Sequence, residues 1–288
     1  MEENVQFHRH NGVDSPKIDY NDLKNLPSTS TIDRLYYLFP NQGTLSAPLR
    51  NPNNYAYDNV NNKLYLIGSS NNTDTMIYRY DIVANNQVRL NSGNDLYPYW
   101  TLKTSYDFPG QGGYCDGTYL YIWARKISNT TWYLLRIAVA DGTTTEMTIS
   151  GTAPDQDEAN TLFGYGTTLY ILDNLTTTVR TYTISGTTAT HGADITLPDN
   201  GTSCIVTNGT NIWFVTDDAG NTRDYNLYKT TMAGVTVSNE YLLEARFSGF
   251  NNNASLIIYN DIVHWIGAII NDTSAATVSK IIKPLVAI

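Results

Sequence analysis

The chain has few of the residues that build disulfide frameworks, charged surfaces or membrane spans. Only two cysteines occur in 288 residues, Cys115 and Cys204, so a disulfide framework is excluded and two buried free thiols are expected. Charged residues make up 16%, and the net charge of -9 argues against a nucleic-acid partner. No apolar run reaches the ~18 residues of a membrane span, and the first residues lack the basic and apolar regions of a signal peptide. We therefore expect no membrane span and synthesis in the cytoplasm without export.

Uncharged polar residues and tyrosine take the place of charge. The chain has 22 tyrosines, and Asn, Thr, Ser and Gly are abundant, as in secreted and virion β proteins. A phenol ring can fill a core while its hydroxyl finds a partner at the edge, and an exposed ring can stack on a sugar. The tyrosine content therefore fits both packing and recognition.

Catalytic motifs are missing from the sequence. It has no GxSxG elbow, phosphate-binding glycine loop, HExxH or CxxC. His191 and His264 are isolated, and the apolar run around His264 is typical of a core histidine. Asp58, Asp116 and Asp261 fall in tight turns, where Asp commonly hydrogen-bonds its own backbone rather than serving in a carboxylate pair. We therefore predict that the protein is not an enzyme.

One supersecondary pattern occurs five times, at residues 53–68, 112–123, 161–172, 204–215 and 256–267. Each unit has a strand-like run, a turn rich in Asn, Asp and Gly, and a stronger apolar run, which is a hairpin signal. A third, alternating strand follows each hairpin, and a weaker fourth run follows in four units. The equivalent positions are predicted to be Leu64, Leu120, Leu169, Ile212 and Ile262.

Four strands repeated at this spacing predict a five-bladed β-propeller of four-stranded blades over residues 32–288. The fifth unit has only three strands, and residues 33–40 are free to pair with it as the fourth. That pairing would close the ring by joining the two ends of the domain. A six-bladed ring would need the insertion around DLYPYW to form a blade, and a two-sheet sandwich does not explain the five repeats.

Residues 1–31 share no pattern with the repeat and are predicted to form a short, extended N-terminal arm and linker. In an extended chain, His8 and His10 project to the same side, roughly 7 Å apart. Residues 8–16 read H-x-H-x-G-x-D-S-P. This segment resembles stretches in tail fibres and minor virion proteins of tailed phages. The resemblance implies a virion protein, such as a tail or capsid fibre or adhesin subunit.

The resemblance also implies how the arm works. His-x-His pairs in some trimeric fibres line the three-fold axis and bind iron, so His8 and His10 would be ligands of an iron-type transition metal in a homotrimer, where six imidazoles suit octahedral binding. The hydrophobic residues in 1–26 are too few to form a core, so the arm would dock on other virion proteins. Alternatively, the two histidines are solvated or cap a turn. The expected attachment residues are Phe7, His8, His10, Gly12, Asp14, Pro16 and Ile18.

The leading interpretation is a structural virion protein that docks through its arm and displays the propeller to recognise a host-surface glycan or protein. Loops on a rigid scaffold suit recognition. Three alternatives stay open: a decoration protein with no receptor role, a virion-associated glycosidase or depolymerase with two carboxylates in a cleft, and a cellular or secreted lectin. The residues expected in the recognition loops are Tyr97, Tyr99, Trp100, Trp132, Asp217, Asp218 and Arg223.

Overall fold

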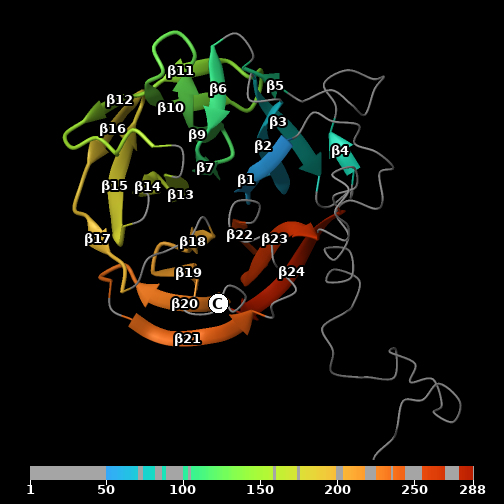
Figure 1. The fold of residues 1–288 in the computed structure, drawn as a ribbon, viewed down its shortest axis with the longest axis vertical. Coiled ribbons are helices and arrows are strands. Elements are labelled where there is room, and N and C mark those ends of the chain that lie inside the picture. The colour runs from blue at the N-terminus through green and yellow to red at the C-terminus, as the bar shows by residue number, and fades with distance from the viewer. Residues whose placement is uncertain are drawn as a thin grey trace, which may run out of the picture.

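The strands that the structure describes form five sheets arranged around a common centre, the arrangement of a β-propeller (Figure 1). The structure is a computed structural model. Every regular element in its described residues is a β-strand. The described residues are 50–70, 74–81, 86–88, 100–102, 105–157, 160–173, 176–198, 204–217, 225–234, 236–243, 255–269 and 279–287.

The sheets are numbered in chain order. Sheet 1 consists of β1 (Arg50–Asp58), β2 (Lys63–Ser70), β3 (Asp74–Asp81) and β4 (Asn86–Val88), with β5 (Trp100–Thr101) also paired to β3. Sheet 2 consists of β6 (Tyr106–Pro109) and β8 (Tyr114–Cys115), both paired to β9 (Tyr119–Lys126), followed by β10 (Trp132–Ala138) and β11 (Thr144–Glu146). In both sheets, one strand is paired by two short strands in succession.

Sheet 3 is the widest and takes strands from the chain of sheet 2 at both edges. Its own strands are β13 (Thr161–Tyr165), β14 (Thr168–Leu172), β15 (Thr178–Ser185), β16 (Thr188–His191) and β17 (Ile195–Thr196). The two added strands, both parallel to their partners, are β7 (Gln111–Gly112) beside β13 and β12 (Thr148–Ser150) beside β16. Sheets 2 and 3 are therefore hydrogen-bonded to one continuous segment of chain.

Sheets 4 and 5 are the last two in chain order among the described residues. Sheet 4 consists of β18 (Ile205–Thr207), β19 (Asn211–Asp217), β20 (Tyr225–Thr231) and β21 (Thr236–Leu243). Sheet 5 consists of β22 (Ser255–Tyr259), β23 (Ile262–Ile269) and β24 (Ser279–Ala287). The innermost strands contact one another in the cyclic order β1, β8, β13, β18, β22 and back to β1. Sheet 5 thus lies against sheet 1.

The five predicted hairpins are confirmed, whereas several finer expectations are corrected. The predicted equivalent position in sheet 5 is wrong: Val263 is the fully buried residue there, and Ile262 is half-buried. The run at 145–150, expected as one outer strand, divides between β11 and β12, which belong to different sheets. The predicted closing strand at 33–40 lies outside the described residues.

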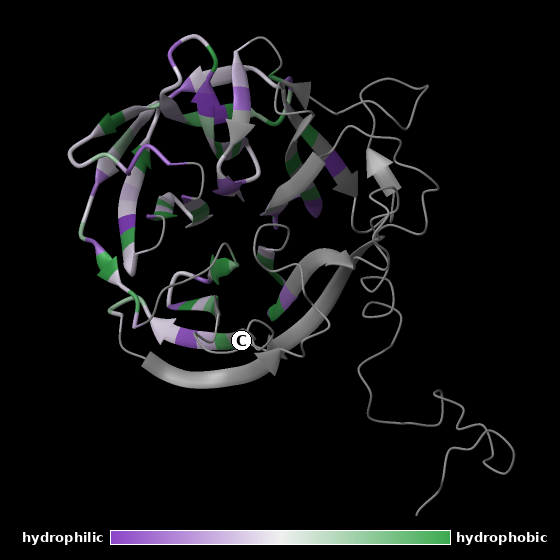
Figure 2. Ribbon diagram, viewed as in Figure 1, coloured by the Kyte–Doolittle hydropathy of each residue, from purple (hydrophilic) through white to green (hydrophobic). Residues whose placement is uncertain are grey.

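The hydrophobic core lies between neighbouring sheets. Alternate residues of β9 face opposite ways: Leu120 and Ile122 pack in a cluster with sheet 1, whereas Tyr121 and Trp123 pack in a cluster with sheet 3. A third cluster joins sheets 3 and 4. Figure 2 shows hydrophobic residues concentrated in the strands rather than in the connecting turns. Because the middle strands bury both faces, they read as continuous apolar runs in the sequence.

Close backbone approach between sheets 3 and 4 gives a test of this packing. Gly234 has φ +77°, and a Cβ added there would lie 2.3 Å from the Thr196 carbonyl oxygen in β17. Gly186 has a similar φ of +59° with nothing within 4 Å. We expect Gly234→Ala to lower the free energy of unfolding by about 2 to 4 kcal/mol, and Gly186→Ala by about 1 to 2 kcal/mol. Urea unfolding of both variants checks this, and equal losses would contradict the close approach.

Candidate functional site

A cavity of ≈ 820 Å³ lies among the innermost strands, and all five sheets contribute to its lining. Its volume falls within the usual range for small-ligand sites, about 300 to 1,000 Å³. The hairpin turns that follow these strands also line it. We call these turn residues the rim: Asn59, Val60, Asp116, Tyr165, Asn208 and Asp261.

Acidic and amide side chains shape the turns of the rim. Asp116 Oδ1 accepts hydrogen bonds from the backbone N–H of Thr118 and Tyr119 at 2.8 and 2.7 Å, and its Oδ2 accepts one from the Tyr121 hydroxyl at 3.0 Å. Asn208 Oδ1 accepts the same pair of backbone bonds in its own turn. The expectation that turn aspartates bond their own backbone is confirmed for Asp116.

Asp58 holds the turn of sheet 1 in a similar way but is buried. Its Oδ1 accepts hydrogen bonds from the backbone N–H of Val60 and Asn61, each at 3.0 Å, and its Oδ2 accepts one from Asn61 Nδ2 at 2.8 Å. The carboxylate is therefore committed to the turn. It does not line the cavity.

Neighbouring turns contact one another around part of the rim. Asn61 Nδ2 donates to the Gly117 carbonyl at 3.0 Å, which joins sheets 1 and 2. The Tyr114 hydroxyl donates to the Gly166 carbonyl at 2.9 Å, which joins sheets 2 and 3. The Tyr165 ring lies so close to Gly209 that a Cβ there would be 2.4 Å from Cδ1. Contacts between sheets thus fix the positions of the turns.

The tyrosines at the cavity differ in how fully they are engaged. The Tyr57 hydroxyl donates to Asn62 Oδ1 at 2.9 Å, and its ring packs edge-on against Tyr259. The Tyr114 ring stacks on Tyr121. Burial raises the pKa of Tyr57 and of Tyr114 well above the ordinary value, so both phenols stay protonated and donate. Tyr165, in contrast, is 50% exposed.

The charge of the lining is acidic. Among the described residues that line the cavity, the charged side chains are Asp116 and Asp261, and none is Lys, Arg or His. Asp261 is exposed in its turn. The cavity therefore presents phenol rings, amides, hydroxyls and two carboxylates to a ligand.

Most residues predicted for the recognition loops lie where their side chains are not described. Tyr97, Tyr99, Asp218 and Arg223 are outside the described residues, as is the whole attachment segment with His8 and His10. Trp100 and Asp217 are placed only as backbone, in β5 and at the end of β19. Their role in recognition stays a prediction.

Trp132 corrects the predicted set of loop residues. It begins β10, is only 7% exposed, and stacks on Trp123 with ring centroids 6.3 Å apart. Its backbone N–H donates to Gln156 Oε1 at 2.8 Å, and Trp123 Nε1 donates to the Asp157 carbonyl at 3.1 Å. The segment 156–157 thus binds over the two indoles. Trp132 is part of the core between sheets 2 and 3, not of an exposed loop.

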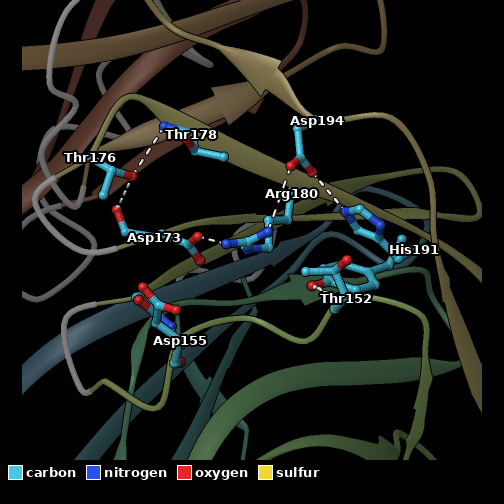
Figure 3. A network of polar contacts seen from close by, with 10 residues as sticks. Thr152, Asp155, Asp173, Thr176, Thr178, Arg180, His191 and Asp194 are labelled. Carbon is cyan, nitrogen blue, oxygen red and sulfur yellow. Dashed lines mark hydrogen bonds and ion pairs between the residues drawn. The ribbon is translucent and has the colours of Figure 1, made fainter.

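His191, predicted to be isolated, belongs to an ion-pair network in sheet 3 (Figure 3). Its Nε2 lies 2.7 Å from Asp194 Oδ1, and Asp194 Oδ2 lies 3.6 Å from an Arg180 guanidinium nitrogen. Arg180 Nε donates to Asp173 Oδ2 at 2.7 Å. Burial raises the pKa of Asp173, and Arg180 opposes that rise. The network joins Arg180 of β15 to the residue after β14, and through Asp194 to His191 of β16, and none of its residues lines the cavity.

The described residues were compared with the requirements of a metal site and of a membrane-spanning helix. They contain no group of three or more His, Cys, Asp or Glu side chains placed to hold a metal ion. They also contain no helix long and apolar enough to cross a membrane. Cys115 and Cys204 are buried free thiols, as predicted.

The tyrosines of the cavity lining, among them Tyr57, Tyr114 and Tyr165, were not among the predicted site residues. In their hairpins, Tyr57 pairs with Leu64, Tyr114 with Tyr121 and Tyr165 with Thr168, which are three different register positions. A shift of one residue turns a strand side chain to the other face, so no single position of the repeat carries these tyrosines.

Comparison with known proteins identifies no family. No family model and no curated protein matches the chain. Hydrazine synthase of Kuenenia stuttgartiensis is 12% identical at a TM-score of 0.41, with 80% of this chain and 60% of that chain covered. TolB of Acinetobacter baumannii is 10% identical at 0.39, with 68% and 45% covered. Glutaminyl cyclase of Myxococcus xanthus is 10% identical at 0.44, with 83% and 95% covered.

The chain spans less than two thirds of the length of the first two of these proteins. At such identities and TM-scores, the likenesses carry no argument about what this chain does. Its function has to be argued from its own residues.

His264 gives the described core a predictable pH dependence. The ring is buried in β23, with Nδ1 2.9 Å from the Ile262 carbonyl. Burial lowers the pKa of His264 from 6.5 to about 4, although the hydrogen bond to Ile262 opposes this. Between these values, the unfolded chain binds a proton that the folded chain does not. The free energy of unfolding should therefore fall as the pH is lowered from 7 to 4, by up to ~3 kcal/mol from this group.

A matched variant isolates this contribution. His264→Gln keeps every carboxylate of the protein but has no titrating imidazole. We expect the stability of the wild type relative to the variant to decline as the pH falls from 7 to 4, measured by urea unfolding at each pH. A constant difference across that range would show that His264 does not titrate as described.

Proposed function

We propose that this chain is a structural subunit of a virus particle, docked through its N-terminal arm and displaying a five-bladed β-propeller of four-stranded blades that recognises a glycan on the host surface. The observation that carries the recognition part is the convergence of turns from all five sheets on one cavity. A surface built in this way holds several side chains in fixed relative positions. Such rigidity reduces the ordering cost of binding.

The docking part rests on the sequence of residues 1–26. Their H-x-H-x-G-x-D-S-P segment resembles attachment segments of tail fibres, and their sparse hydrophobic residues call for a partner surface on other virion proteins. Three arms meeting on an axis would present six imidazoles from His8 and His10 to a transition metal. The proposed location of the protein is accordingly the virion.

The five-bladed ring is proposed from the cyclic contact of the innermost strands. Sheet 4 has four strands, whereas sheet 5 has three in the described residues, and β24 pairs there with β23 alone. We propose residues 33–40 as the fourth strand of sheet 5. Pairing of β24 with that run would protect an edge that otherwise invites aggregation.

Removal of residues 1–31 tests the docking role. The truncated protein should keep the melting temperature of the full chain, because the five sheets and their proposed closing strand lie downstream. It should be absent from purified virions, because the docking segment is gone. Copy number per particle, measured by quantitative mass spectrometry, provides the readout.

The full chain carrying Tyr165→Ala is the control for this experiment. The arm of this variant is intact, so the variant should be incorporated at the normal copy number even if the substitution weakens glycan binding. Normal incorporation of the truncated protein would overturn the docking role, and so would loss of folding on truncation.

The double variant His8→Ala, His10→Ala tests the role of the histidine pair. Neutral imidazoles bind metal and protonated ones do not, so metal-dependent trimerisation should weaken below about pH 6 in the wild type. The double variant should lose both metal and trimer while its propeller melts normally. Arg9→Ala is the matched control, because Arg9 projects to the other side of an extended arm. If elemental analysis finds no transition metal in the wild-type trimer, metal binding by His8 and His10 is refuted.

A further inference from the structure

We infer that the rim of the axial cavity binds an uncharged saccharide, with the ring of Tyr165 as its stacking surface. This inference rests on the proposed function, because it assigns a ligand class and a set of residues to the recognition proposed there. Three properties of the rim lead to it: one open aromatic ring, an acidic lining with no base, and polar groups with unused hydrogen-bonding capacity.

Tyr165 is the aromatic residue of the rim that is available to a ligand. It ends β13, lies on Gly209 of the next sheet and leaves half of its surface exposed. Within the described part of the chain, no hydrogen bond engages its hydroxyl. A single exposed ring is ordinary on a protein surface, but this one lines a cavity and is held in place there by the backbone of the next sheet. The C–H face of a sugar ring matches such a surface, and the phenol hydroxyl can bond to a sugar hydroxyl.

The charges of the lining exclude anionic ligands. Asp116 and Asp261 are the charged side chains among the described lining residues, and no Lys, Arg or His accompanies them. A sialylated, sulfated or phosphorylated group would meet like charge with no compensating cation. The saccharide that fits is therefore uncharged.

Polar groups suited to sugar hydroxyls surround Tyr165. Asn208 uses its Oδ1 in the turn, which leaves its Nδ2 as a donor. Asn59 and Asp261 are exposed on the rim, and no hydrogen bond within the described residues engages either side chain. Donors and acceptors from different sheets thus face one hollow. Multiple directional bonds to hydroxyl groups are the kind of contact that orients a polar ligand.

A cationic ligand is the competing class, since tyrosine and carboxylates also attract cations. Recognition of a quaternary ammonium uses several open ring faces around the charge. Here the rings of Tyr57 and Tyr114 are packed against Tyr259 and Tyr121, so Tyr165 alone is half-exposed. The observations favour the neutral ligand, and the test below separates the two.

The test is calorimetric titration of the full chain with a panel of oligosaccharides: neutral hexose and N-acetylhexosamine oligomers, sialylated and sulfated glycans, and cationic chitosan oligomers. Wild type should bind a neutral member with an affinity that changes little between low and high salt. Tyr165→Ala should weaken binding by about ten-fold or more, as for a central aromatic contact, whereas Tyr165→Phe should stay within about three-fold.

Two matched variants complete the set. Ile127→Ala removes another exposed large hydrophobic side chain, outside the cavity lining, and should leave affinity unchanged. Asp261→Asn removes a charge while keeping a polar side chain that tolerates the positive φ of this turn, 58°. It should alter neutral-saccharide binding by less than about three-fold, whereas a cation would lose much more. Unchanged melting temperatures identify these effects as effects on binding.

The outcomes separate this inference from the proposed function. Binding of a neutral saccharide through Tyr165 by a chain that is absent from virus particles would leave the inference standing and refute the proposed function. Presence on particles with neutral-saccharide binding unaffected by Tyr165→Ala would refute the inference alone. Binding only to the anionic or cationic members, or to no member of the panel, would also overturn it.

Discussion

Burial of the middle strands between adjacent sheets is the interaction on which the described structure depends. In β9, one set of side chains completes the cluster with sheet 1 and the alternate set completes the cluster with sheet 3. Neither face could be covered within sheet 2 itself, so each sheet relies on its neighbours for desolvation. The same dependence sets the cavity rim, whose turns are positioned by contacts such as Tyr114 with Gly166 and Tyr165 with Gly209.

Local sequence was enough to predict the hairpins. An Asn, Asp or Gly in the turn and an apolar run after it act over a few residues, and the resulting turns have positive φ at Asn62, Gly117 and Gly166. The hydrogen bonds from a turn aspartate to its own backbone, as at Asp116, were predictable for the same reason. Burial on both faces also produced the long apolar runs from which the repeat was recognised.

Features that depend on distant residues could not be predicted. Trp132 follows a polar turn and looks exposed in the sequence, but its neighbour Trp123 and the segment 156–157 cover it. The pair of His191 with Asp194 is local, three residues apart, but its link to Arg180 depends on the pairing of β16 and β17 with β15. The exposure of the Tyr165 ring likewise depends on the neighbouring sheet that its turn contacts. The spacing of residues along the chain does not reveal that contact.

The parallel pairing of β7 and β12 with sheet 3 has a mechanical consequence. One stretch of chain runs from the inner edge of sheet 3, through all of β9 and β10, to its outer edge, so sheets 2 and 3 cannot separate without breaking ladders at both edges. No such ladder in the described residues joins any other two sheets. Under load, sheets 2 and 3 would respond as one rigid body, because both ladders must break before these two sheets separate.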